Sequence, residues 1–318
     1  MNKYLVGAIA LVLVSSAGAQ WQIGAAAPEA RSRAAGAIIG DDFFYMSGET
    51  TGGARNTTAW RYNVPTNSWS SIADLPDFGV SNTAAATVGT NVYLPGGFNG
   101  AAGVDRMAIY NSGANTWSAG AAMPSISFAH SVASIGTDVY VVGGSATGVA
   151  GTSLYRYDTV ANTWTTLAAM TTARQYAAAV GIGGMLYVAG GNTTNLTTVE
   201  IYDPNSNTWS AGTPMSTGRG GLALYNLNGN PYAVAGGWTT YLTSTEEFSG
   251  GTWSAGPAVN FGGRTIAHAG NSSWLVKAGG WNGSYMDGVE FMNAVPEPAT
   301  FVAIGIGLAG LALLRRRK

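Results

Sequence analysis

The chain has 318 residues, of which 46 are glycine and only 10% are charged. This composition is too apolar and aromatic for a disordered protein, and without cysteine the fold must be stabilised by packing alone. Residues 20–294 contain 10 basic and 15 acidic side chains, a net negative charge that argues against a nucleic-acid partner.

Residues 1–19 have the pattern of a secretory signal peptide. Lys3 provides the positive start, Tyr4–Val14 is an apolar run too short to span a bilayer comfortably, and residues 17–19 form a small-x-small cleavage site. A buried core strand is the alternative, but the order of these three features favours a leader. We therefore predict cleavage by signal peptidase ahead of Gln20 and an exported mature chain.

The region 20–294 repeats one pattern six times. A tryptophan recurs every 44–48 residues, at Trp21, Trp69, Trp117, Trp164, Trp209 and Trp253. Apolar runs end in a pair of small residues at Ser47-Gly48, Gly96-Gly97, Gly143-Gly144, Gly190-Gly191, Gly236-Gly237 and Gly279-Gly280. Between pair and tryptophan stands an aromatic residue: Tyr62, Tyr110, Tyr157, Tyr202, Phe248 and Phe291. Two independent markers thus count six units.

Each unit is predicted to contain four short strands. In the unit that ends near Trp164, we expect strands at Ser131–Ile135, Val139–Gly144, Ser153–Tyr157 and Thr163–Leu167, with a hairpin turn between the first two. Helical periodicity is not convincing outside the two ends of the chain. We interpret the six tryptophans as packing between units and Asp158 and Asp203 as local turn residues.

The order of the markers predicts how the ring closes. Trp21 precedes any small-residue pair, whereas the last unit has Gly280 and Phe291 but no following tryptophan. The N-terminal segment therefore supplies the fourth strand of the last unit, which removes an exposed sheet edge. The predicted fold is an all-β, six-bladed propeller closed by its N-terminal strand.

Residues 295–318 form a separate tail. The motif at 295–300 contains Pro296, Glu297 and Pro298, and the apolar run 299–314 is followed by four basic residues at 315–318. A 16-residue helix reaches about 24 Å, slightly less than a hydrocarbon core of about 30 Å, but terminal cations are typical of a cytoplasmic stop. We predict a transmembrane helix at 299–314 that leaves the propeller on the opposite side of the membrane.

The repeat resembles the kelch repeat. The shared features are the paired glycines, the spaced tryptophans, Tyr157-Asp158, Tyr202-Asp203, Met123-Pro124 and Arg174, and they cover residues 20–294. The first unit departs from the pattern at Ser47, and the fifth and sixth lack the Tyr-Asp pair. In kelch propellers the loops after the glycine pair and the loops entering each first strand share one face.

The tail resembles the PEP-CTERM sorting signal of Gram-negative bacteria. In that family an exosortase is thought to cut near Pro-Glu-Pro, and the proteins are associated with exopolysaccharide and biofilm. The resemblance implies processing by exosortase, an inner-membrane-anchored precursor facing the periplasm, and a final place on the cell surface or in the extracellular matrix.

The predicted binding rim combines two sets of loops. The loops after the glycine pairs contribute Phe98, Asn192, Trp238 and Trp281, and the loops entering the first strands contribute Arg31, Arg33, Arg174, Arg219 and Arg264. Aromatic faces and guanidinium groups suit sugars, carboxylates or acidic peptides. The alternative is that these arginines lie along the loops and donate hydrogen bonds to backbone carbonyls.

Other chemistry is not favoured. The two histidines, His130 and His268, lie in different units without a carboxylate cluster, so we predict no metal site and no cofactor. Galactose oxidase shares the kelch architecture, but its cross-linked Tyr-Cys cofactor needs a cysteine that this chain lacks. Lys277 stands in a predicted apolar strand. We interpret it as partly exposed near the ring closure, and a buried catalytic base is the alternative.

Three functions remain. The favoured one is a non-enzymatic binding module of the surface or biofilm matrix that takes a glycan, such as exopolysaccharide, or a surface protein. The second is an enzyme on acidic sugars, similar to kelch-type sialate mutarotases, in which Glu49 and the rim arginines act together. The third is a purely structural surface protein. No catalytic residue is assigned.

Overall fold

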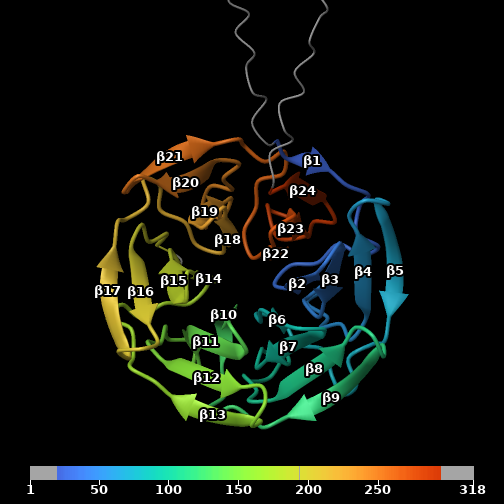
Figure 1. Cartoon of the computed structure of the whole chain (residues 1–318). Helices are drawn as coiled ribbons and strands as arrows, with labels where there is room; N and C mark the ends of the chain where they lie inside the picture. Colours follow the sequence, from blue (N-terminus) through green and yellow to red (C-terminus); the bar gives the residue numbers. More distant parts are fainter. Residues whose placement is uncertain (1–19, 193, 295–318) are drawn as a thin grey trace, which may run out of the picture.

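The computed structural model describes residues 20–192 and 194–294, which form a ring of six four-stranded antiparallel sheets (Figure 1). The predicted all-β, six-bladed propeller is thereby confirmed. The predicted leader and sorting tail, with its membrane helix at 299–314, lie outside the described residues. Nowhere in the described part is there a helix with the length and hydropathy needed to cross a bilayer.

Each blade runs from an inner strand at the axis to an outer strand at the rim. Blade 1 contains β2 (Ala35–Ile39), β3 (Asp42–Met46), β4 (Ala59–Asn63) and β5 (Ser68–Ile72). Blade 2 contains β6 (Ala86–Val88), β7 (Asn91–Pro95), β8 (Met107–Asn111) and β9 (Thr116–Gly120). Blade 3 contains β10 (Phe128–Ile135), β11 (Asp138–Ser145), β12 (Leu154–Asp158) and β13 (Thr163–Thr166).

The other three blades repeat this plan. Blade 4 contains β14 (Ala178–Ile182), β15 (Met185–Ala189), β16 (Val199–Asp203) and β17 (Thr208–Gly212). Blade 5 contains β18 (Ala223–Leu227), β19 (Asn230–Val234), β20 (Thr245–Ser249) and β21 (Thr252–Gly256). Blade 6 contains β22 (Ala267–Gly270), β23 (Trp274–Ala278), β24 (Val289–Asn293) and β1 (Gln22–Ile23).

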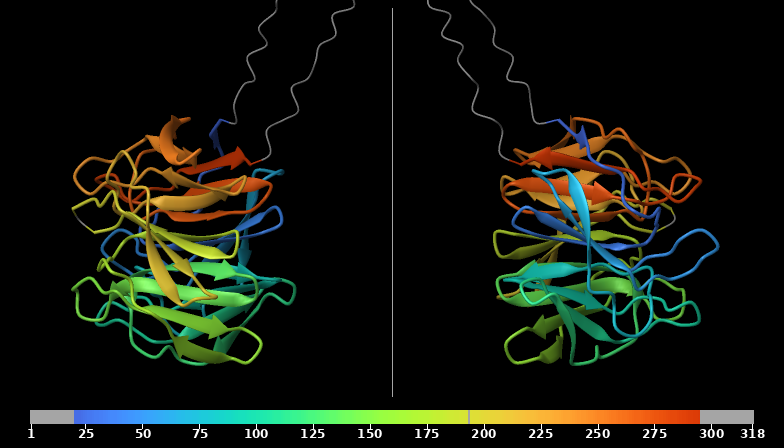
Figure 2. Two further views of the ribbon diagram at one scale, coloured as in Figure 1. Left: turned by 60° about the vertical axis from the view of Figure 1, so that its left-hand side comes forward. Right: turned by 90° about the vertical axis from the view of Figure 1, so that its right-hand side faces the viewer.

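The ring closes as the marker order predicts. β1 pairs with β24 through Gln22 opposite Phe291 and Ile23 opposite Glu290, and Figure 2 shows β1, in blue, beside the red strands of blade 6. Trp21 is only 6% exposed, and its ring stacks on Tyr232 of blade 5 with centroids 6.5 Å apart. The first strand therefore completes the last sheet and leaves no open blade.

The tryptophans join neighbouring blades. The indole Nε1 of Trp164 donates to the carbonyl of Ala121 in the preceding blade at 2.8 Å. The same bond recurs from Trp69, Trp117, Trp209 and Trp253. At the closure, Trp21 Nε1 instead donates to the Tyr232 hydroxyl at 3.3 Å. Packing between blades is therefore the confirmed role of these residues.

A turn asparagine, which sequence analysis did not single out, reinforces four of the six junctions. Asn162 has a left-handed φ of 55°, and its Oδ1 accepts hydrogen bonds from the Tyr157 hydroxyl and from the Ala121 N–H of the preceding blade. Asn67, Asn115 and Asn207 make the same two contacts. Blade 5 has Phe248 in place of the tyrosine and Gly251 in place of the asparagine. The tyrosine hydroxyl and the asparagine oxygen that accepts its hydrogen bond are therefore both absent from this blade.

The small-residue pairs connect each blade to the loop that enters the next. The first member adopts a left-handed φ of 56–66° at Ser47, Gly96, Gly143, Gly190, Ala235 and Gly279. The N–H of the second member donates at 2.7–2.8 Å to one loop carbonyl, that of Val80, Ser127, Arg174, Arg219, Gly263 or Arg31. We call this place in each repeat the arginine position, because blades 1, 4 and 5 have arginine there. In blade 5 the pair is Ala235-Gly236, one residue earlier than predicted.

Candidate functional site at one mouth of the channel

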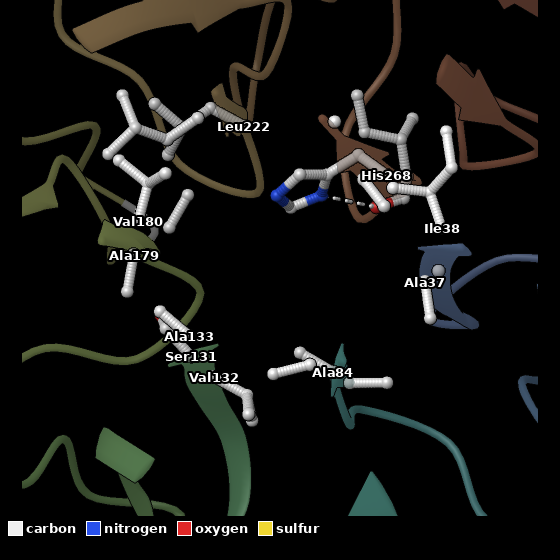
Figure 3. Close-up of a pocket in the computed structure, with 18 of the residues that line it drawn as sticks. Ala37, Ile38, Ala84, Ser131, Val132, Ala133, Ala179, Val180, Leu222 and His268 are labelled. Carbon is white, nitrogen blue, oxygen red and sulfur yellow. Dashed lines mark hydrogen bonds between the residues drawn. The ribbon is translucent and has the colours of Figure 1, made fainter. Parts of the chain in front are cut away.

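A cavity of about 460 Å³ runs along the axis of the ring. The inner strands line it with small apolar side chains, among them Ala37, Ala84, Ala133 and Ala179, while the His268 imidazole projects into it (Figure 3). Because each inner strand presents short side chains to the axis, the blades approach closely without filling the channel.

A closed ring of backbone hydrogen bonds surrounds one mouth of this channel. Its members lie at the start of the six inner strands, just before the strand in five blades and within β10 in blade 3: Arg33, Asn82, Ala129, Tyr176, Gly221 and Thr265. Each N–H donates to the carbonyl of the member in the preceding blade at 2.6–3.0 Å, and all six have φ between 51° and 66°. The left-handed turn points each N–H along the ring, which makes this mouth a fixed platform for the side chains above it.

Nine side chains meet on this platform, and we call them the mouth cluster: Arg33, Glu49, Arg55, Tyr176, Trp238, Tyr241, Arg264, Trp281 and Tyr285. Blades 1, 4, 5 and 6 contribute them. The loops after the pairs and the loops entering the inner strands meet through isolated bridges, such as Ser32 with Glu49 and Arg264 with Trp281. The two loop sets expected on one face are thus found together.

Glu49 organises the acidic half of the mouth cluster. Its carboxylate forms an ion pair with Arg33, lies 3.5 Å from Arg55, and accepts a hydrogen bond from the Tyr285 hydroxyl at 3.0 Å. The Glu49 side chain is 8% exposed, whereas those of Arg33 and Arg55 are 28% and 24% exposed. One nearly buried carboxylate therefore holds two guanidinium groups that still reach solvent.

Aromatic rings form the other half. The Arg264 guanidinium lies over Trp238, 4.0 Å from the ring centroid, and Tyr176 packs on the same indole at 4.8 Å between centroids. Trp281 Nε1 donates to the Tyr241 hydroxyl at 3.2 Å. Further ring contacts link Arg264 to Tyr241 and Trp281 to Tyr285, so the aromatic and acidic halves are continuous.

The charges at this mouth are crowded. Burial lowers the pKa of Arg264, and the positive charge of Arg33 lowers it further. Burial raises the pKa of the Tyr176 hydroxyl, which Arg33 partly opposes. The mouth cluster contains three guanidinium groups and one carboxylate, so it carries two excess positive charges. An anionic group placed here would relieve that repulsion.

The nine predicted rim residues separate into four groups. Arg33, Trp238, Arg264 and Trp281 belong to the mouth cluster. Phe98 lies at its edge, where the Arg55 guanidinium sits 5.1 Å from the ring centroid. Asn192 has a structural role, because its Oδ1 accepts from the Gln175 N–H at 2.9 Å and its Nδ2 donates to the Ala173 carbonyl at 3.0 Å.

The structure corrects the predicted place of three arginines on the binding rim. The side chains of Arg31, Arg174 and Arg219 are fully buried, so they do not face a ligand. Each guanidinium donates to two backbone carbonyls in its own blade, as Arg174 does to Gly190 at 2.7 Å and Thr198 at 3.0 Å. Arg174 also pairs with Glu200 at 3.0 Å. Burial alone would raise the pKa of Glu200, but hydrogen bonds from Thr171 and Arg174 outweigh it and lower that pKa. These arginines stabilise the blades.

Sequence reasoning missed Arg55, Tyr176, Tyr241 and Tyr285. Tyr176 could have been found, because it stands two residues after Arg174 as Arg33 does after Arg31. The other three lie in loops that share no repeat position. Only the fold brings them beside Glu49 and Trp281.

The prediction that Lys277 is partly exposed is wrong. Lys277 is 1% exposed, and its Nζ lies 2.5 Å from Glu290 and donates to the Phe261 carbonyl at 2.9 Å. Blade 6 has Gly263 at the arginine position and so lacks the arginine, but it keeps the carboxylate, because Glu290 stands opposite Lys277 in the register of β23 and β24. Lys277 therefore supplies the cation that arginine supplies in blades 4 and 5. Burial lowers its pKa, and Glu290 opposes that change.

His130 makes the stability of the propeller depend on pH. Burial lowers its pKa to about 4, and its Nε2–H donates to the Pro95 carbonyl at 3.1 Å. The unfolded chain binds a proton near pH 6.5, so stability falls as pH drops from about 6.5 toward 4. We expect a loss of about 2–3 kcal/mol from this residue at pH 4.5.

Urea unfolding at pH 7 and pH 4.5 checks this expectation. The His130→Gln variant should lose that much less stability than the natural chain over the same interval. If both proteins lose the same amount, the pH dependence arises elsewhere.

Comparisons with known proteins agree with this architecture. A model of the Attractin/LZTR1 beta-propeller family matches residues 11–245, and a model of the PEP-CTERM protein-sorting motif matches residues 294–318. Kelch-like protein 25 of Xenopus tropicalis is 32% identical over 105 residues, which cover 33% of this chain and 17% of that protein. The solved structure of YjhT superimposes with a TM-score of 0.70 at 17% identity, covering 83% of this chain and 94% of that one.

Proposed function

This chain belongs to the Attractin/LZTR1 beta-propeller family, and from that premise we propose that it is an exported, non-enzymatic binding module whose mouth cluster holds an acidic glycan. The PEP-CTERM motif indicates export, membrane-anchored sorting in a Gram-negative bacterium, and processing by exosortase-type machinery. A place on the cell surface or in the matrix is part of the proposal, and exopolysaccharide is the ligand class that it favours.

The mouth cluster is the observation that supports this function. Arg33, Arg55 and Arg264 offer charged donors, and among the residues that the structure describes Glu49 is the one carboxylate that pairs with Arg33 and Arg55. The Nε atoms of Arg33 and Arg55 have no hydrogen-bond partner among the described residues. Guanidinium groups bind carboxylates in a bidentate manner, and the neighbouring aromatic rings suit the apolar faces of sugar rings. A uronate-type sugar has both features.

A second candidate is an enzyme that acts on acidic sugars. The specific observation in its favour is that Glu49 converges with two arginines and with the Tyr285 hydroxyl. A carboxylate and a phenol side by side at a ligand mouth are the residue types of general acid and base catalysis. Burial and the Glu49 charge raise the pKa of Tyr285, which keeps the phenol protonated as a donor.

Calorimetry with the purified full-length chain tests the binding proposal. We expect saturable binding of oligogalacturonate, and weaker binding by about tenfold or more in the Trp238→Ala/Trp281→Ala double variant and in Arg264→Met. Arg156→Met is the control, because Arg156 lies on β12 outside the cluster. Unchanged binding in the cluster variants would remove the proposal.

Catalysis is separated from binding by NMR of anomeric exchange in N-acetylneuraminate. The binding module predicts no acceleration by the natural chain. Acceleration that disappears in Glu49→Gln would favour the enzyme instead.

A further inference from the structure

The arginine position of blade 3 is occupied by Ser127. Its backbone matches the position in the other blades, because the Ser127 carbonyl accepts the Gly97 N–H at 2.8 Å just as the Arg174 carbonyl accepts the Gly144 N–H at 2.8 Å. Blades 1, 4 and 5 place arginine here. Blade 3 therefore keeps the loop but lacks the side chain.

The acceptors for a guanidinium group recur in these blades. In blade 5, Arg219 donates through Nη1 to the Ala235 and Ser244 carbonyls, each at 2.7 Å, and through Nη2 to the Ser244 hydroxyl at 3.0 Å. Arg174 uses the Gly190 and Thr198 carbonyls and the Thr198 hydroxyl in the same way. Two carbonyls, one hydroxyl and one carboxylate thus form the receptor in these blades, the carboxylate being that of Glu246 in blade 5 and of Glu200 in blade 4.

Blade 3 retains the two carbonyls and the hydroxyl of this receptor without an arginine to occupy them. The equivalent acceptors are the Gly143 and Ser153 carbonyls and the Ser153 hydroxyl, since the Gly143 N–H donates to the Ser153 carbonyl as the Gly190 N–H does to that of Thr198. The Ser153 hydroxyl turns to the Gly143 carbonyl through a long contact of 3.4 Å. Ser127, Gly143 and Ser153 line a cavity of about 410 Å³.

The surroundings of this cavity suit a peptide. Ile126 and Val149 line it and are 39% and 74% exposed, so both present apolar surface to solvent beside the cavity. Tyr155 also lines the cavity and stands opposite Val141, where blade 4 has Glu200 opposite Val188. An aromatic side chain stands in place of the carboxylate, as Trp60 does opposite Tyr45 in blade 1. In that blade the Arg31 guanidinium lies 5.4 Å from the Tyr45 ring centroid and pairs with Glu29 at 2.6 Å.

We propose that the blade 3 cavity binds an arginine side chain of a partner protein, flanked by apolar residues that cover Ile126 and Val149. These acceptors select a guanidinium over an ammonium group, because the ligand must donate to two carbonyls and a hydroxyl at once and only the planar guanidinium has its N–H donors arranged for this. No carboxylate lines the cavity, so binding should depend little on salt. This site is distinct from the mouth cluster and does not rest on its function.

The probe is the peptide acetyl-Leu-Arg-Val-amide, compared with the same peptide carrying citrulline, a neutral isostere of arginine. NMR of the labelled full-length chain should show saturable shifts of the Gly143, Gly144 and Ser153 amides with the arginine peptide. Affinity for the citrulline peptide should be at least about tenfold lower, since it lacks the charge-assisted donors.

Two variants place the binding in this cavity. Ser127→Arg should fill the receptor from within the chain, as in blade 4, and abolish the shifts. Ala146→Trp should block the cavity from an exposed lining residue, and it decides the question if Ser127→Arg does not fold. Val160→Trp, at a residue 86% exposed and absent from the lining, is the matched control. Equal affinity for both peptides, or binding that survives Ala146→Trp, would overturn the proposal.

Discussion

Replacing Arg219 with methionine is expected to lower the free energy of unfolding by about 3–5 kcal/mol. The Arg219 side chain is fully buried and bonded to the Ala235 and Ser244 carbonyls, with Glu246 2.9 Å away. Methionine fills similar space but removes the charge, so Glu246 and both carbonyls lose a donor inside the blade. An uncompensated buried carboxylate is the main cause of the expected loss.

Urea unfolding at pH 7 measures this loss as a shift of the midpoint with an unchanged slope. The control is Arg156→Met, because Arg156 lies 3.8 Å from Asp138 in a pair whose side chains are 38% and 25% exposed. Such a pair contributes about 0–1 kcal/mol. Adding Glu246→Gln to Arg219→Met should recover part of the stability. A cost below about 1 kcal/mol for Arg219→Met would contradict a structural role for the arginine position.

Replacing Trp21 with alanine is expected to cost about 3–5 kcal/mol and to loosen the closure of the ring. β1 pairs with β24 through two residues, and the following segment adds hydrogen bonds from the Gly24 and Ala27 N–H groups to the Val289 and Asp287 carbonyls. The buried Trp21 side chain provides the apolar contact that these backbone bonds lack. That side chain contacts Tyr225 and Tyr232 of blade 5, at 6.1 and 6.5 Å between centroids. Removing it leaves a cavity between blades 5 and 6.

Denaturation and amide hydrogen exchange together test the closure. Exchange of β24 amides should accelerate in Trp21→Ala, because β24 becomes an edge strand whenever β1 detaches. Ile23→Ala is the control on the same strand, since Ile23 is 57% exposed and should change stability by less than about 0.5 kcal/mol. If β24 keeps its protection in Trp21→Ala, the closure does not depend on the indole.

Sequence and structure agree where a side chain serves its own repeat unit. Asp158 illustrates this, because its carboxylate accepts from the Val160 and Ala161 N–H groups within one turn, as its place in the chain predicts. Arg31 and Arg33 illustrate the opposite case. They are two residues apart, yet Arg31 is fully buried while the Arg33 side chain is 28% exposed at the mouth. The left-handed turn at Arg33 separates them, and no pattern of residue types distinguishes the two.

By itself, the sequence determined the number of blades, the strand that closes the ring, and the sorting motif. A unit of this size cannot bury both faces of its sheet alone, so each carries its packing residues at a regular spacing that can be counted. Only the tertiary structure decided which arginines reach solvent, why Lys277 is buried beside Glu290, and that Glu49 meets Tyr285 from the other end of the chain. These outcomes depend on contacts between distant loops and on register between strands, and neither leaves a period in the sequence.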